Sequence, residues 1–307
     1  MMKDYLNDID SRFPIRNSEA QKEAFRGYAV SEAQAAGWTA GTVQESGGHN
    51  NVVIGDPETA RTVFTAHYDT PRRGLFPNLM LPTNKLLKYL YLAAVILPML
   101  AVAIYAGVLV RKLTGLEGAA GRFVYLGVYA LVYFALFLLL FRGPANARNR
   151  NDNTSGTAAV LTLAQKLAGD PTSAFILFDN EEKGKKGSKA FAAAHPEIKA
   201  KTLIINMDCV GNGDTFIAGA SDPAIADRRY PRLRAVLENA GGKVFSAAKA
   251  SMNSDHKSFD KSVGIAACLY KNGVGFYTPR IHTGRDTVAS PENIERLTDA
   301  LREFVEG

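Results

Sequence analysis

The chain has 307 residues, of which 47% are hydrophobic and 21% are charged, and its formal net charge is +6 at pH 7. Its basic residues are spread through loop-like segments with no stripe of interleaved aromatic residues, so no nucleic-acid partner is expected. Its two cysteines, Cys209 and Cys268, lie in apolar strand-like segments and offer neither a disulfide framework nor a thiolate metal site.

The N-terminal segment predicts a helix followed by short strands. Residues 1–13 are charged and interrupted and lack the apolar core of a secretory signal, so export of the N-terminal part is not expected. The run Ser18-Glu19-Ala20-Gln21 has the pattern of a capping box, which predicts a helix from here to about Ala36. Short strands are then expected at 41–44, 51–54 and 61–66.

Two long uncharged runs occupy the middle of the chain. Tyr89–Val110 contains 22 residues and Phe123–Phe141 contains 19. As helices they would be roughly 33 and 28 Å long, which matches a bilayer core of about 30 Å. Both runs are apolar around the whole helix rather than along one stripe. They predict a transmembrane hairpin, and the alternative is a helical hairpin buried inside a soluble protein.

The remainder of the chain alternates between helical and strand patterns. Helices are expected at 157–167, 223–239 and 291–305, and strands at 173–178, 202–207 and 264–270. This alternation predicts an α/β fold with a mixed, mainly parallel sheet flanked by helices and interrupted by a two-helix transmembrane hairpin. The expected organisation is one α/β domain formed by residues 1–85 and 142–307, with the hairpin at 86–141 and spans at about 89–110 and 123–141.

Acidic residues and histidines occur where the predicted strands pass into loops. They are His67, Asp152, the pair Glu181-Glu182, Asp208 and His282. Ligands gather outside the carboxyl ends of the strands in an open α/β sheet, so these side chains can converge although they lie far apart in sequence. Two imidazoles and three carboxylates suffice for two zinc ions that share one carboxylate, and the fourth acid can act as a base. The pattern predicts a metallohydrolase with two metal ions.

Five sequence segments give this pattern a family resemblance. They are His67-Tyr68-Asp69-Thr70, Asn151–Gly156, Asn180–Ser188, Asn206-Met207-Asp208 and Ile281–Thr287. In type and order they resemble the signature blocks of the family-28 zinc metallopeptidases. That family contains bacterial secreted aminopeptidases, glutamate carboxypeptidase and, more distantly, the animal glutaminyl cyclases. The resemblance covers nearly all of the chain outside 71–150.

The resemblance implies two zinc ions per chain and a role for each metal ligand. His67 and Asp208 would hold one zinc, Glu182 and His282 would hold the other, and Asp152 would bridge both. In the family, the peptide bond that follows the bridging aspartate is cis. A peptide hydrolase would use this centre to activate water.

The resemblance also implies roles for residues that do not bind metal. Glu181 would be the general base, and Asp69 would accept a hydrogen bond from the other ring nitrogen of His67. One subgroup of the family has a tyrosine directly before the last histidine, where it assists the oxyanion. Ile281 fills that place here, so Tyr277 is the nearest candidate. Asp255, in a segment that resembles another pocket-lining block, is expected to order a loop rather than bind metal.

Three functions are compatible with the sequence. The first is a membrane-anchored di-zinc exopeptidase, an aminopeptidase acting on peptide substrates. The second is a single-zinc acyltransferase similar to glutaminyl cyclase. The third is a catalytically inactive interaction protein, although a complete ligand set and base argue against loss of activity.

The predicted hairpin adds the lipid bilayer as a partner and allows a homo-oligomer through its helices. Lys and Arg residues near the span ends are more numerous on the peptidase side than in the connecting loop, which predicts a cytoplasmic peptidase domain, as in a bacterial inner membrane. Because the insertion begins close to His67 and ends close to Asp152, the mouth of the active site is expected near the membrane surface.

Overall fold

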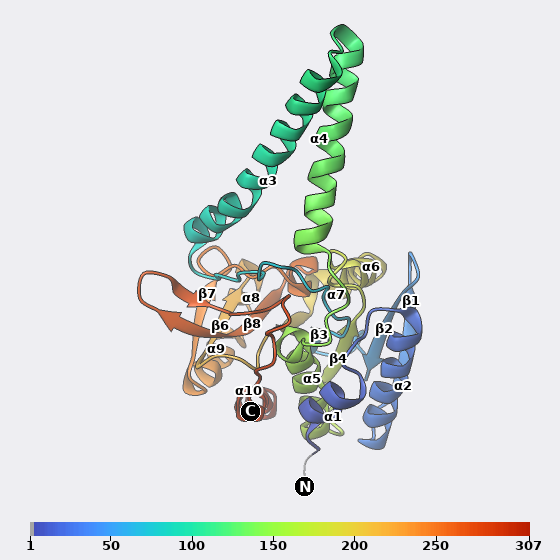
Figure 1. The fold of residues 1–307 in the computed structure, drawn as a ribbon. Helices are drawn as coiled ribbons and strands as arrows, with labels where there is room; N and C mark the ends of the chain where they lie inside the picture. Colours follow the sequence, from blue (N-terminus) through green and yellow to red (C-terminus); the bar gives the residue numbers. More distant parts are fainter. Residues whose placement is uncertain (1–2) are drawn as a thin grey trace.

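The computed structural model describes residues 3–307 as a sheet covered by helices, from which a long helical hairpin projects (Figure 1). Residues 1 and 2, which begin the expected first part of the peptidase domain, lie outside the described residues. Helix α1 near the start of the chain and the C-terminus lie at the end of the molecule opposite to the hairpin (Figure 1).

The strands of the sheet are β1 (Ala40–Glu45), β2 (His49–Ile54), β3 (Thr62–His67), β4 (Ser173–Phe178), β5 (Leu203–Met207), β6 (Thr215–Ala220), β7 (Gly242–Ser246), β8 (Ser262–Lys271) and β9 (Gly275–Tyr277). Within residues 3–307 they form one nine-stranded sheet in the order β1-β2-β4-β3-β5-β8-β6-β7, and β9 pairs with β8. The central run β4-β3-β5-β8 is parallel. The pairs β1–β2, β2–β4, β6–β8 and β8–β9 are antiparallel. The mixed α/β sheet with a parallel centre confirms the predicted fold class.

The helices of the body are α1 (Tyr5–Arg12), α2 (Glu19–Ala35), α5 (Gly156–Lys166), α6 (Lys186–Ala194), α7 (Pro196–Lys201), α8 (Asp222–Ile225), α9 (Tyr230–Asn239) and α10 (Pro291–Glu306). The predicted capping box is present, since the Ser18 side chain accepts from the Gln21 backbone and the Gln21 side chain accepts from the Ser18 backbone. Because side chains alternate along a strand, each face of the sheet carries its own apolar core. On β3, Phe64 packs in the core shared with α2, α5 and α10, whereas Val63 packs in the core shared with α6 and α7.

One predicted helix is divided in the structure. Residues 223–239 were expected to form a single helix, but they form α8 and α9 with a turn between them. In that turn the Asp227 carboxylate accepts hydrogen bonds from the backbone and side chain of Arg229 and from Lys261. An aspartate that bonds the backbone two residues ahead competes with helical hydrogen bonding, which explains the break.

The hairpin consists of α3 (Lys85–Thr114) and α4 (Gly118–Phe141). The helix α3 extends beyond the expected span 89–110 at both ends, and α4 begins five residues before the expected span 123–141 and ends with it. The Asn84 side chain caps the start of α3, and Gly115 ends it with a left-handed φ of 65°. The helices meet closely where a Cβ atom on Gly107 would lie 2.9 Å from the Tyr125 ring.

The two helices of the hairpin have almost no cover from the rest of the chain. Only 17% of the most apolar window of α3 and 0% of that of α4 is buried. A buried helical hairpin would be largely covered by protein, so that alternative is wrong. Both helices are long and apolar enough to cross a membrane.

Candidate metal centre

The predicted metal ligands meet at the carboxyl edge of the parallel strands. His67 is the last residue of β3, and it lies opposite Phe178, the last residue of β4. Asp208 directly follows β5, the other neighbour of β3. Parallel strands that end at one level therefore bring His67, Asp208 and the loop after β4 together, as the sequence predicts.

Asp152 lies between the two histidines. Its Oδ1 atom is 3.5 Å from Nε2 of His67, and its Oδ2 atom is 3.1 Å from Nε2 of His282. It is buried in the segment Arg150–Ser155, directly before α5, and the peptide bond from Asp152 to Asn153 is cis, as the resemblance implies. One oxygen of this carboxylate thus faces each histidine, which is the geometry that a bridging ligand needs.

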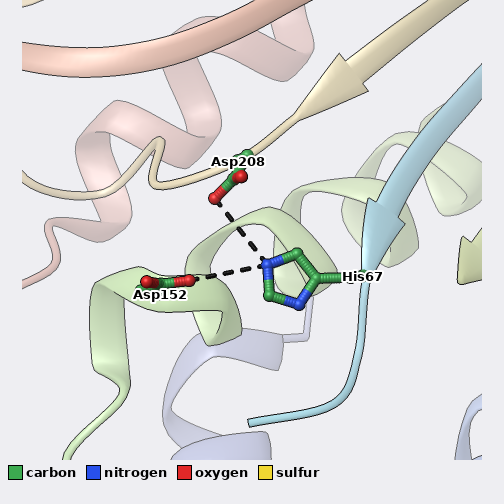
Figure 2. Close-up of side chains that lie close together, drawn as sticks. All are labelled: His67, Asp152 and Asp208. Atoms are coloured by element: carbon green, nitrogen blue, oxygen red, sulfur yellow. Dashed lines mark ion pairs between the residues drawn. The ribbon is translucent and has the colours of Figure 1, made fainter. Parts of the chain in front are cut away.

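The two remaining predicted carboxylate ligands, Asp208 and Glu182, each lie beside one of the histidines. Oδ1 of Asp208 is 3.8 Å from Nε2 of His67, and Figure 2 shows the Asp152 and Asp208 carboxylates converging on that ring. On the other side, Oε1 of Glu182 is 3.4 Å from Nε2 of His282. The ligand atoms of His67, Asp152 and Asp208 lie within 4.8 Å of one another, as do those of Asp152, Glu182 and His282. The structure thus brings together all five predicted ligands.

Asp69 contacts His67 in a way that the sequence did not predict. Nδ1 of His67 lies 3.1 Å from the backbone carbonyl oxygen of Asp69, whereas the Asp69 carboxylate is 3.5 Å away. Because a carbonyl oxygen only accepts, Nδ1 donates its proton to it, so Nε2, which faces Asp152, is the ring nitrogen placed to bind a metal. The Asp69 carboxylate instead accepts from the backbone N–H groups of Glu181, at 2.9 Å, and Glu182, at 3.2 Å. Asp69 therefore positions both His67 and the glutamate pair.

The donor set fits zinc. Oε1 of Glu182 and Oδ1 of Asp208 are buried, and neither has a hydrogen-bond partner among residues 3–307. An unpaired buried carboxylate oxygen is costly unless a cation compensates it, and both of these oxygens point toward imidazole nitrogens at the site. Imidazole nitrogen and carboxylate oxygen are zinc donors, so the side chains present fit this metal.

The protonation equilibria of the site also indicate a place for cations. Burial raises the pKa of Glu182 to about 8, and the Asp152 carboxylate adds to that shift. Burial raises the pKa of Glu181 well above its usual range, with Asp255 and Glu182 contributing. Burial alone would lower the pKa of His282, but Glu182 and Asp152 outweigh it and raise the pKa to about 10. A bound cation would restore the ionised carboxylates and the neutral imidazole.

Supporting residues of the Asp152 segment were missed by sequence reasoning. The buried Asp286 carboxylate accepts from the backbone N–H groups of Asn151, at 3.2 Å, and Asp152, at 3.0 Å. The Asn153 side chain accepts from Gly156 and Cys209 and donates to a backbone carbonyl at the end of β5. In the sequence, the only indication of a role for Asn153 and Asp286 is that they lie in the same motifs as the predicted ligands Asp152 and His282.

Several backbone conformations at this edge are strained. Within residues 3–307 the non-glycine residues with left-handed φ are Asn180, Lys185, Cys209, Arg280 and His282. All of them lie in the loops that carry or adjoin the predicted metal ligands. Such conformations cost of order 1–3 kcal/mol each and cluster at functional sites, where the surrounding structure enforces them.

Two other sequence-predicted residues, Tyr277 and Asp255, do not line the pocket that the predicted ligands share. Tyr277 is half-buried at the end of β9, where it pairs with Leu269, and it does not line the pocket, whereas Ile281 does. Its assignment as the oxyanion donor therefore stays a prediction without a supporting contact. Asp255 starts a short 3₁₀ turn and is fully buried; burial raises its pKa to about 7.

The ligands open into a pocket of about 240 Å³. Glu181 lines this pocket together with His67, Asp152 and Asp208. Its wall also includes Asn78 and Met80 from the linker before the hairpin, and Lys88 from the first turns of α3. The mouth of the pocket therefore adjoins the foot of the hairpin, as the position of the insertion in the sequence predicts.

Known structures share this architecture. A Zn-dependent exopeptidase from Parabacteroides distasonis superposes with a TM-score of 0.60 at 16% identity, covering 98% of this chain and 95% of that one. A glutaminyl cyclase from Porphyromonas gingivalis superposes with a TM-score of 0.57 at 15% identity, covering 99% of this chain and 96% of that one. At these identities the similarity shows the fold.

Sequence comparison adds the family. The chain is 29% identical over 155 residues to a probable leucine aminopeptidase of Arthroderma benhamiae, a match that covers 46% of this chain and 42% of the relative. The chain thus spans less than half the length of the curated relative that it matches. The sequence profile of peptidase family M28 matches residues 145–305, which is more than half of the 307 residues. The chain therefore belongs to peptidase family M28.

Proposed function

We propose that this protein is a membrane-anchored di-zinc metallopeptidase, and most specifically an aminopeptidase. The observation that carries the proposal is the position of Asp152, whose two oxygens face His67 and His282 from between them at 3.5 and 3.1 Å. His67 and Asp208 would hold one zinc ion, and Glu182 and His282 the other, with Asp152 shared. Bound zinc would supply Lewis acidity, which polarises a carbonyl group and lowers the pKa of water.

Glu181 is the base in this proposal. It lines the pocket beside Glu182, and the Asp69 carboxylate fixes its backbone. Water adds to the scissile carbonyl carbon while Glu181 takes its proton, and Glu181 then delivers that proton to the leaving nitrogen as the C–N bond breaks. Proton transfer by a positioned side chain is typically worth about 10²–10⁴ in rate. The role of Asp69 is to hold the base and His67 in one fixed arrangement.

The two other functions make different demands on the site. An acyltransferase similar to glutaminyl cyclase would use one zinc and would not need water as the nucleophile. A catalytically inactive interaction protein would have no use for a base or for a complete ligand set, and this chain retains both. The family membership and the leucine aminopeptidase relative support the hydrolytic function.

A panel of peptides tests the proposed function. The purified, zinc-loaded protein should release N-terminal amino acids from free dipeptides and from fluorogenic amino-acid amides, and chelation should abolish release. N-acetylated versions of the same substrates should be cleaved much more slowly. Cyclisation of a peptide with N-terminal glutamine, without any hydrolysis, would instead establish the acyltransferase.

We further propose that residues 1–85 and 142–307 form one peptidase domain and that residues 86–141 cross the bilayer twice. Large apolar side chains of the hairpin face outward; examples are Tyr105, Phe123, Leu131 and Leu139, which are between 68% and 76% exposed. So much apolar surface is not stable in water and is matched by lipid. The same exposed helices offer a surface for the homo-oligomer that the sequence allows.

The charge distribution supports a cytoplasmic peptidase domain. Seven basic residues flank the spans on the domain side: Arg72, Arg73, Lys85, Lys88, Arg142, Arg148 and Arg150. Three lie near the connecting loop: Arg111, Lys112 and Arg122. Positive residues near span ends stay on the cytoplasmic side, so the excess supports a domain on that side, as in a bacterial inner membrane.

Cysteine labelling tests this topology. The two native cysteines are buried, so single cysteines introduced at the exposed positions Thr114 and Lys189 report alone. In intact cells an impermeant thiol reagent should label Thr114→Cys, in the loop, whereas Lys189→Cys, on the domain, should react only after permeabilisation. Labelling of Lys189→Cys alone in intact cells would invert the orientation.

A further inference from the structure

A second pocket lies at the foot of the hairpin, next to the metal pocket. Its volume is about 320 Å³, and α3, α4 and the linker before α3 all contribute to its wall. The two pockets share Asn78, Lys88, Glu182 and His282. Two metal-ligand residues therefore separate the pockets, and Lys88 stands at their junction.

One face of α3 forms the apolar wall of this hairpin-foot pocket. Lys88, Tyr91, Leu92 and Val95 all line it, and their spacing of three, four and seven residues places them on the same side of the helix. Phe141 at the end of α4 also lines the pocket. The Tyr91 hydroxyl donates to the Pro77 carbonyl oxygen at 2.8 Å, which ties this face to the linker that covers the metal pocket.

The rim of the pocket carries unpaired positive charge. Lys88, Arg142 and Lys183 line it, and within residues 3–307 none has an acidic group within the 4.0 Å of a salt bridge. The acidic residues that line the pocket are Asp69 and Glu182. Asp69 is committed to the backbone of the glutamate pair, and Glu182 faces His282. An apolar wall with free cations at its rim complements a ligand that has an apolar body and one anionic group.

We propose that the hairpin-foot pocket is the subsite for the C-terminal residue of dipeptide substrates. The apolar wall receives an apolar side chain, and Lys88 receives the free carboxylate. Lys88 lines both pockets, so it is placed to bind a carboxylate that lies one residue beyond the scissile bond. The inference rests on the proposed peptidase function and narrows it to dipeptides with an apolar second residue.

Matched substrates and variants test the carboxylate contact. For Ala-Leu, Lys88→Met should lower kcat/KM by about ten- to a hundredfold, mainly through KM, since a hydrogen bond to a charged group is lost. For Ala-Leu amide the same change should have less than about a twofold effect, because the amide carries no charge for Lys88 to bind. Lys88→Arg should retain most of the kcat/KM for Ala-Leu. Lys112→Met, at the far end of α3, should leave kcat/KM unchanged for both substrates.

The apolar wall is tested in the same way. Leu92→Ala should reduce the preference for Ala-Leu over Ala-Ala by about tenfold, because the leucine side chain of the substrate loses its contact with the Leu92 side chain. Leu97→Ala is the matched control, because Leu97 lies on the same helix, is 61% exposed and does not line the pocket.

A binding measurement separates this inference from the proposed function. Calorimetric titration of Ala-Leu and its amide into Glu181→Gln, with or without Lys88→Met, reports the subsite without turnover. If the free acid binds more tightly than the amide and Lys88→Met removes that difference, the subsite is supported. This holds even if the wild-type protein cleaves no peptide. Failure to cleave would contradict the peptidase proposal but not the subsite. Equal binding of acid and amide, or an equal loss for both with Lys88→Met, would overturn the inference.

Discussion

Replacing Asp152 with asparagine should nearly abolish peptide hydrolysis, by about 10³-fold or more. The carboxylate presents one oxygen to each side of the site, 3.5 Å from His67 and 3.1 Å from His282. Asparagine has the same shape, but it presents an NH₂ group in place of one of the two carboxylate oxygens. It also removes the negative charge that the two proposed metal sites share. Metal Lewis acidity is worth several kcal/mol in the transition state, and each 1.36 kcal/mol is tenfold in rate.

The control for this change is Asp214→Asn, at an exposed aspartate away from the pocket, which should retain full activity. The measurements are kcat/KM on a dipeptide and thermal unfolding of the metal-free proteins. Metal-free Asp152→Asn should still unfold in one cooperative transition, because the isosteric side chain keeps its volume in the segment. Full activity in Asp152→Asn would remove the bridging role and the two-metal mechanism with it.

Replacing Glu181 with glutamine should have the next largest effect, and its signature should differ. The change removes the base without removing a proposed metal-ligand residue, so turnover should fall by about 10²–10⁴-fold while metal content stays near the wild-type value. The Asp69 carboxylate bonds to the backbone of residue 181 rather than to its side chain, so the loop should keep its position.

Glu182→Gln is the partner experiment. Because Glu182 faces His282 at 3.4 Å with a buried, unpaired oxygen, this change should weaken one metal site and leave a chain that needs excess zinc for activity. Metal content and kcat of the two variants, measured side by side, distinguish the roles. If Glu181→Gln lost metal while Glu182→Gln kept it, the two neighbouring residues would exchange their assignments.

The sequence predicted the strands and the convergence of the ligands because both depend on local pattern. Strand β3 ends at His67 and β5 ends just before Asp208, and parallel strands end at a common edge. The convergence of the five predicted ligands could therefore be inferred from the sequence alone. The motif order supplied the position of Asp152 between them, which periodicity alone could not provide.

Other features depend on contacts between distant segments and had no signal of their own. The carbonyl rather than the carboxylate of Asp69 meets the His67 ring, since the carboxylate is used by the turn after β4. Asp286, which holds the backbone of Asp152 from 134 residues away, was overlooked for the same reason.

The hairpin also has features that the sequence predicts and features that it does not. Its two helices were predictable from uncharged runs, but the role of Lys88 was not, because one lysine before an apolar span has an ordinary explanation as a positive flank. Only the packing of α3 over the linker shows that Lys88 and Asn78 line both the metal pocket and the hairpin-foot pocket. Conversely, Tyr277 was chosen by nearness in sequence, and β9 holds it in the sheet instead.

The most direct test of the two-metal centre is the zinc content of the protein purified without chelator. Elemental analysis should approach two zinc ions per chain for the wild-type protein, and titration of the metal-free protein should restore hydrolysis in step with occupancy. Asp152→Asn should bind neither ion tightly under the same conditions. A single tightly bound zinc ion that survives Asp152→Asn unchanged would contradict the account.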